Sequence, residues 1–294
     1  MTQRTILVTG GAGHVGSHVV ELLVCDPGNR VISLDNYFLG RVENHVAGAE
    51  YRRGHTKEIG RLVPETPDLV FHLGEYARIA PSFDDVELVY DMNVTGTFAV
   101  VDFCRVRGVR KLVYAGSSTK FAIEGDGRHQ SPYAFTKATN VDLITDFGRW
   151  YGLPYTICYF YNGFGPGERG DEKYGTLIAK FEAQWRRGEP LTVVRPGTQR
   201  RAFTYVKDLA RGIILAGELG QRPEYALGAT TSHSVLEIAE AFGGPVQLIE
   251  GNPGRHESVN DAAAAREELG WNTTVDVIEY IQEFVRNTPR GGTS

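Results

Sequence analysis

The chain has 294 residues, of which 41% are hydrophobic and 23% charged, and its formal net charge is −5. This composition suits a globular protein with a sizeable core, and the scattered basic residues argue against a general nucleic-acid or anionic-membrane surface. No run of about 18 apolar residues is present and the N-terminus lacks a signal-peptide pattern, so we expect no membrane span and a cytoplasmic location. Cys25, Cys104 and Cys158 lie far apart, so we expect neither a disulfide framework nor a metal site.

Strands and helices are predicted to alternate as far as residue 162. β-Branched runs predict strands at 5–10 and 31–36, with a helix between them. The alternation continues with strands at 68–74, 111–118 and 154–162 and with helices at 89–108 and 132–151. Ser131 and Pro132 suit the N-cap and first turn of the last of these helices. Repeated strand–helix–strand units predict an α/β fold with a doubly wound parallel sheet.

Beyond residue 162 the pattern becomes irregular. Helices are predicted near 175–187, 206–218, 234–242, 262–269 and 275–286, and short strands near 191–195, 202–205 and 246–249. We therefore expect two unequal lobes. The larger takes residues 1–165 with a returning segment near 200–220, and residues 166–294 mainly form a smaller, discontinuous C-terminal lobe.

A glycine-rich segment, GGAGHVG, follows the first predicted strand and supplies Gly10, Gly13 and Gly16. Glycines there let the backbone approach a pyrophosphate, and the N-terminus of the next helix favours its negative charge. Asp35, at the end of the second strand, can accept hydrogen bonds from both hydroxyls of a ribose and would repel a 2′-phosphate. The pattern predicts a dinucleotide site for NAD rather than NADP, although Arg41 lies nearby. A structural turn followed by an unrelated aspartate is the alternative.

Tyr133 and Lys137 lie one helical turn apart in the segment SPYAFTKATN. A free tyrosine has a pKa near ~10 and is a poor base at neutral pH. An ammonium on the same helix face stabilises the phenolate, which can then remove a hydroxyl proton while hydride leaves the same carbon. The pair alone is common in helices, so its meaning depends on the motifs around it.

Taken together, the motifs resemble those of the extended short-chain dehydrogenase/reductase superfamily, in its branch of NAD-dependent nucleotide-sugar epimerases and dehydratases. The glycine spacing is G-x-x-G-x-x-G, and the other matching segments are FHLGEYARIAPSFDD, NVTGT, AGSSTKF, YFYNGFGPGE, TQRRAFTYVKDLARGI and NPGRHESVNDAAAAREELGW. The resemblance covers nearly the whole chain. It implies a Rossmann-type NAD-binding lobe, a smaller substrate lobe, NAD as cofactor and a nucleotide-diphosphate sugar as substrate. It also implies a homodimer formed through the helices at 89–107 and 132–151.

The resemblance also implies roles for individual residues. Tyr133 would remove the proton, Lys137 would support it and hold the nicotinamide ribose, and Ser117 would hydrogen-bond the substrate hydroxyl. The implied cofactor contacts are Gly10, Gly13, His14, Val15, Gly16, Asp35, Asn36, Leu73, Gly74, Asn93, Tyr133, Lys137 and Tyr159. The implied substrate contacts are Ser117, Ser118, Asn162, Arg201 and Arg255, with Arg200 as an alternative to Arg201 and a surface position as the alternative for each arginine.

The residues after Ser117 favour one reaction. Family dehydratases carry an acidic pair there and family decarboxylases usually keep a glutamate at the second position, whereas this chain has Ser118 and Thr119. The resemblance therefore favours a 4-epimerase, which passes hydride to and from tightly bound NAD through a transient 4-keto sugar. A 4,6-dehydratase, a 4-dehydrogenase or reductase, and a non-catalytic NAD-binding regulator are the alternatives. Glu75 and Tyr76 replace small residues of the family, which indicates an unusual substrate.

Overall fold

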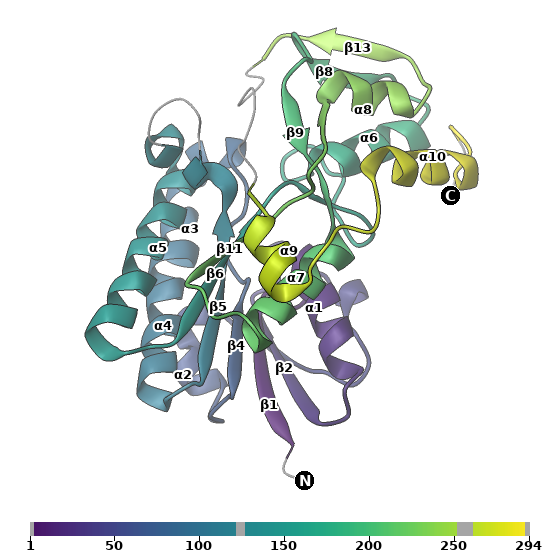
Figure 1. Cartoon of the computed structure of the whole chain (residues 1–294). Coiled ribbons are helices and arrows are strands. Elements are labelled where there is room, and N and C mark those ends of the chain that lie inside the picture. The colour runs from purple at the N-terminus through teal and green to yellow at the C-terminus, as the bar shows by residue number, and fades with distance from the viewer. Residues whose placement is uncertain (1–2, 122–126, 252–260, 292–294) are drawn as a thin grey trace.

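The computed structural model describes residues 3–121, 127–251 and 261–291 (Figure 1). Its centre is a seven-stranded sheet in which all neighbouring strands are parallel. The strands stand in the order β11-β6-β5-β4-β1-β2-β3. This arrangement confirms the predicted α/β fold with a doubly wound parallel sheet.

The strands of this sheet differ in how clearly their sequences predict them. They are β1 (Arg4–Thr9), β2 (Asn29–Asp35), β3 (Glu50–Arg53), β4 (Leu69–His72), β5 (Lys111–Ser117), β6 (Tyr155–Phe160) and β11 (Glu224–Leu227). The sequence pattern predicts the central five and misses β3 and β11. Both missed strands are four residues long and lie at the sheet edges. Because an edge strand buries less of its surface, it lacks the continuous apolar run of the central strands.

Helices cover both faces of the sheet (Figure 1). One face carries α1 (His14–Val24), α7 (Val206–Glu218) and α9 (Ala263–Leu269), and the other carries α2 (Ile59–Leu62), α4 (Gly96–Arg107) and α5 (Pro132–Tyr151). Short 3-10 helices lie at Val42–Asn44, Thr56–Glu58, Ala80–Phe83, Ser118–Phe121 and Gly127–Gln130. Within the described ranges, no helix has both the length and the apolar character that crossing a bilayer would require.

The helix before α4 contains an irregularity. α3 (Val86–Val89) continues through a π-helical turn (Tyr90–Thr95) into α4, where the sequence pattern predicts one regular helix. Asn93 lies in this turn and is fully buried. Its side chain accepts a hydrogen bond from the Tyr76 backbone N–H at 2.7 Å and donates to Thr136 Oγ1 at 3.0 Å. The π-helical turn therefore places the side-chain amide of Asn93 where it bonds both the segment after β4 and helix α5.

The second lobe lies beyond the carboxyl ends of the sheet strands (Figure 1). It contains α6 (Leu177–Arg186), α8 (Val235–Ala241), α10 (Val277–Asn287) and the parallel pair β8 (Leu191–Val194) and β13 (Val246–Ile249). Its apolar core includes Phe181, Trp185, Phe242 and Ile281. Two further small pairings join β7 (Gly163–Phe164) to β10 (Thr204–Tyr205), and β9 (Arg200–Ala202) to β12 (Ser232–Ser234).

The strand order reverses beside β1, and this reversal positions the site. Chain segments leave β1 and β4 in opposite directions, which opens a crevice at the carboxyl ends of these two strands. Gly10 has a φ of +73°, and a Cβ on it would lie 2.7 Å from backbone atoms of Gly74. The two segments can therefore come this close only because residue 10 has no side chain.

Ile213 on α7 tests the packing of this helix on the sheet, because its side chain is fully buried. We expect Ile213→Ala to lower the free energy of unfolding by about 2–5 kcal/mol, since it leaves a cavity. Leu219, just beyond α7, is 54% exposed, and Leu219→Ala should change stability by less than about 0.5 kcal/mol. Urea unfolding of the two variants gives the comparison, and equal losses would contradict the packing described here.

Candidate active site

A cavity of about 490 Å³ lies where the two lobes meet above the carboxyl ends of the strands. Its walls come from the glycine segment, the ends of β4, β5 and β6, the start of α5 and the second lobe. The sequence-predicted residues that line it are Gly10, Gly13, His14, Val15, Gly16, Leu73, Ser117, Ser118, Tyr133, Lys137, Asn162 and Arg201. The fold thus brings together residues that are up to 191 positions apart, from Gly10 to Arg201.

The glycine segment fits a dinucleotide pyrophosphate. Gly13 is the N-cap of α1 and no side chain caps that helix end, so its first N–H groups are available to an anion. A Cβ on Gly16 would lie 2.1 Å from the Gly10 carbonyl oxygen, so only glycine fits there. Burial lowers the pKa of His14 to about 3, which keeps its ring neutral. Its Nε2 is buried and has no hydrogen-bond partner among the described residues.

A small pocket of about 10 Å³ adjoins the glycine segment at the carboxyl end of β2. Asp35, Asn36, His55 and Gly74 are among the residues that line it. The Asp35 carboxylate accepts hydrogen bonds from the backbone N–H groups of Ala12 at 3.0 Å and Tyr37 at 2.7 Å. Burial raises the pKa of Asp35, while these two bonds oppose that rise. A carboxylate has further acceptor positions, so Asp35 can still receive both hydroxyls of a ribose.

Local structure explains how Tyr133 and Lys137 reach the cavity. Ser131 caps α5, because its side chain accepts a hydrogen bond from the Ala134 backbone N–H at 3.1 Å. Tyr133 and Lys137 then lie one turn apart at the start of the helix and face the end of β5. Ser117, the last residue of β5, accepts a hydrogen bond from Thr119 Oγ1 at 3.0 Å. The hydroxyl hydrogen of Ser117 therefore remains free for a ligand in the cavity.

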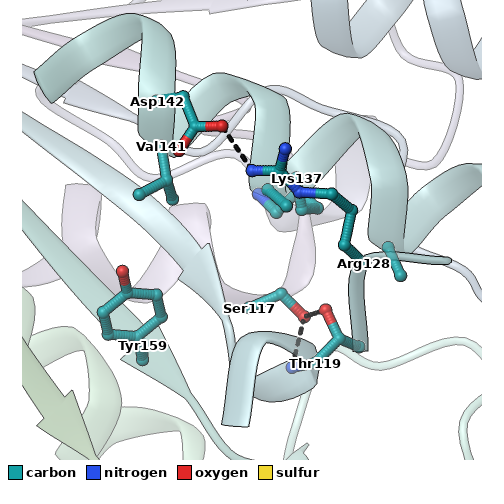
Figure 2. A pocket seen from close by; sticks show the side chains of 9 residues that line it. Ser117, Thr119, Arg128, Lys137, Val141, Asp142 and Tyr159 are labelled. Atoms are coloured by element: carbon teal, nitrogen blue, oxygen red, sulfur yellow. Dashed lines mark hydrogen bonds and ion pairs between the residues drawn. The ribbon is translucent and has the colours of Figure 1, made fainter. Parts of the chain in front are cut away.

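A smaller cavity of about 200 Å³ lies beside the first (Figure 2). Ser117, Thr119 and Lys137 line both cavities and form a shared wall between them. Arg128 also lines the smaller cavity and forms an ion pair with Asp142 on α5. The contact between Thr119 and Ser117 is visible in the same view. The Ser117 side chain is thus oriented by its contact with Thr119 at the end of β5.

Some predicted residues lie elsewhere. The side chain of Asn93 forms hydrogen bonds with Tyr76 and Thr136, and Asn93 is not among the residues that line the large cavity. Tyr159 is 1% exposed and donates a hydrogen bond to Glu224 at 3.1 Å. The residue of β6 that lines the large cavity is its neighbour Phe160, because adjacent residues of a strand point to opposite faces.

The predicted substrate arginines differ in their positions. Arg201 lines the large cavity, whereas Arg200 pairs with Glu237 at 3.3 Å and donates to Ser232. The structure therefore favours Arg201 over Arg200 as the residue nearer the cavity. The predicted contact Arg255 falls outside the described residues.

Sequence reasoning assigned no role in the site to four charged residues of the large cavity: Glu75, Arg78, Glu168 and Arg169. Glu75 forms a buried ion pair with Lys137. Arg78 donates hydrogen bonds to the backbone carbonyls of Tyr174 and Ala77. The departure of Glu75 from the family pattern was the one signal that the sequence offered for any of them. Neither Arg78 nor Glu168 stands out by spacing.

Glu168 has an unusual environment for a carboxyl group. Its side chain is only 3% exposed, and its Oε1 lies 3.9 Å from His14 Nδ1. Burial raises its pKa from 4.5 to about 8, although a hydrogen bond from Thr176 and the charge of Arg78 oppose the rise. Near neutral pH the contact with His14 is therefore mainly between uncharged groups. A carboxyl that titrates near neutrality inside a cavity is suited to hold or release a proton there.

Glu168→Gln makes this titration measurable. Between pH 4.5 and about 8 the Glu168 carboxyl binds more protons in the folded chain than in the unfolded chain, so its contribution to the free energy of unfolding falls as pH rises. Glutamine does not titrate. We expect the stability of the variant relative to wild type to increase by about 3 kcal/mol from pH 5 to pH 8. His14 affects both proteins equally and cancels, and parallel pH profiles from urea unfolding would contradict the assignment.

Comparison with known proteins agrees with this geometry. Residues 6–228 match the family model described as the NAD dependent epimerase/dehydratase family. UDP-glucose 4-epimerase of Mycolicibacterium smegmatis is 30% identical over 96% of this chain and 98% of its own. UDP-glucuronic acid decarboxylase 6 of Arabidopsis thaliana is also 30% identical, over 94% of this chain and 86% of its own.

Solved structures show the same likeness. The crystal structure of UDP-glucose 4-epimerase from Thermotoga maritima, determined with UDP-glucose, superposes with a TM-score of 0.87 at 27% identity. The match covers 96% of this chain and 97% of that one. Given the family match, the glycine segment that fits a pyrophosphate and the Asp35 carboxylate that suits a ribose, the chain belongs to the NAD-dependent epimerase/dehydratase family and takes NAD as its cofactor.

Proposed function

We propose that the chain is a nucleotide-sugar 4-epimerase that works through a transient 4-keto sugar. The observation that carries this proposal is the wall of the large cavity. Ser117, Tyr133 and Lys137 lie on it together, and hydroxyl side chains occupy positions 118 and 119. Exchange at one sugar carbon needs one acid–base group and a hydride carrier. Elimination of water needs a second acid–base pair, which these two positions do not offer.

The residues of the chain divide the work as follows. Ser117 donates its free hydroxyl hydrogen to the sugar oxygen and orients it, and Tyr133 takes the proton from that oxygen. Lys137 supports the charge that develops on Tyr133. When bound, NAD supplies the acceptor and later the donor of the hydride. Tyr133 then returns its proton to the same oxygen after the keto sugar has turned over in the cavity.

The nucleotide-diphosphate part would lie toward the second lobe. Asn162 donates from its side chain to the Ala202 carbonyl at 2.8 Å and lines the cavity beside Arg201. Arginines suit diphosphate oxygens because their planar donors can pair with two oxygens at once. The UDP-glucose 4-epimerases similar to this chain support a UDP-sugar as the first substrate to test.

A second candidate is a decarboxylase acting on a nucleotide-linked sugar acid. Arg78, Arg169 and Arg201 all line the large cavity, so it offers several cations to a sugar carboxylate. The similarity to a UDP-glucuronic acid decarboxylase points in the same direction. A 4-keto intermediate formed by the same Tyr133 chemistry would lose carbon dioxide from the adjacent position. The two candidates therefore share the first step and differ in the product.

Product analysis distinguishes the candidates. Purified protein with added NAD is incubated separately with UDP-glucose, UDP-N-acetylglucosamine and UDP-glucuronic acid, and the products are examined by mass and proton NMR. We expect unchanged mass and an inverted C4 coupling pattern with one of the sugars. Loss of carbon dioxide would favour the second candidate, and loss of water would overturn both. Tyr133→Phe should lower the rate by about 10²–10⁴-fold and serves as the control for chemistry at this site.

We also propose that two chains pair through α4 and α5. Large apolar side chains are exposed on these helices, including Phe98 at 51% and Trp150 at 64%, with Val106 and Tyr151 close by in sequence. A cluster of this kind is typical of a surface that another protein covers. We expect Phe98→Glu to convert a dimer into a monomer in sedimentation experiments. Leu219→Glu, at a comparably exposed site on the other face of the sheet, should leave the dimer intact.

A further inference from the structure

Glu75 lies directly behind the proposed catalytic residues. Its side chain is 3% exposed, and it follows β4 at the edge of the large cavity. Its Oε2 forms the ion pair with Lys137 Nζ, which also donates to the Ala115 carbonyl. Lys137 is therefore committed to an anion inside the protein.

The contacts of Glu75 are those that a carboxylate needs. Its Oε1 accepts from Thr97 Oγ1 at 2.8 Å, from Tyr114 OH at 3.0 Å and from Asn140 Nδ2 at 2.7 Å. The Asn140 amide nitrogen and the Lys137 ammonium on Oε2 can only donate, and the two hydroxyls can donate as well. A carboxylate therefore satisfies all four contacts at once.

The surrounding residues cannot take over this charge. Burial lowers the pKa of His72 to about 4, so the imidazole is neutral. Thr97 gives its hydrogen to Glu75, so its contact with His72 Nε2 at 2.9 Å requires the ring to donate. Thr9 then donates to His72 Nδ1 at 2.7 Å. In this buried chain of hydrogen bonds each group donates to the next, from Thr9 through His72 and Thr97 to Glu75. Among the described residues, Lys137 is therefore the one cation in contact with the Glu75 carboxylate.

From this arrangement we propose that Glu75 sets the preference of the site for oxidised over reduced nicotinamide, by cancelling the charge of Lys137. The proposal rests on the proposed function and on the contact between Lys137 and the nicotinamide ribose that the family resemblance implies. Oxidised nicotinamide carries a positive charge and reduced nicotinamide carries none. An isolated ammonium beside the ring would disfavour the oxidised form, and a neutral Glu75–Lys137 pair removes that penalty. Glu75 is thus a positioning and charge-balancing residue.

Cofactor affinities test this directly and need no sugar substrate. The dissociation constants of NAD⁺ and NADH are measured by competition for the wild type and for Glu75→Gln, which keeps the size of the side chain and removes its charge. We expect the ratio Kd(NAD⁺)/Kd(NADH) to rise by about tenfold, the effect of one unit charge at this range. For a two-electron couple this equals a rise of about 30 mV in the potential of bound cofactor.

A double variant separates charge from structure. Glu75→Gln combined with Lys137→Met has the same net charge as the native pair, so the ratio should return to within about twofold of wild type. A merely structural role would weaken both cofactor forms alike and would not be rescued by a second substitution. Glu218→Gln is the matched control, because Glu218 is ion-paired with Arg4 at 2.7 Å, at the start of β1 and so at the end of the sheet away from the cavity.

Two results would overturn the proposal. One is an unchanged ratio in Glu75→Gln, as in Glu218→Gln. The other is a shifted ratio that the double variant leaves unrestored. Because both results concern cofactor binding alone, they remain distinct from a failure of the 4-epimerase proposal, which product analysis decides. Thermal melting of each variant identifies any that does not fold, and the double variant then carries the comparison with wild type.

Discussion

The close approach of two backbone segments beside the sheet is the constraint on which the site depends. The segment after β1 meets the segment after β4 at Gly10 and Gly74. The two backbones lie so close there that neither residue has room for a side chain. The meeting point lies where the strand order reverses, at the carboxyl ends of β1 and β4. The glycine segment, Asp35 and Glu75 all lie beside it.

Much of the fold can be predicted from the sequence because buried parallel strands are continuous apolar runs. The central strands and the main helices follow from that pattern. The edge strands β3 and β11 do not, since each is short and carries a charged residue at its start, Glu50 and Glu224. Their pairing depends on neighbours that are distant in the chain. In the second lobe the pattern predicts β8 and β13 but misses β7 and β12, which are only two and three residues long.

Some residues of the site could be predicted from the sequence and others could not. Ser117, Tyr133 and Lys137 could be predicted because a strand end and one helical turn, both local, bring them to the cavity. Phe160 rather than Tyr159 lines that cavity, since the phase of a strand decides which neighbour faces inward. The charge balance at Glu75 could not be predicted at all. Its partners come from α4, β5 and α5, and only the folded chain brings those donors to one carboxylate.

The π-helical turn at Tyr90–Thr95 gives the chain an unexpected dependence on length. A π turn holds one residue more than an α turn, so the helix before it is out of phase with α4. Deleting a single residue there would restore an unbroken α-helix but would rotate α3 by about 100° relative to α4. Asn93 would then no longer bridge Tyr76 and Thr136. A single-residue insertion or deletion that a surface loop would absorb should therefore disrupt the structure when it falls in this segment.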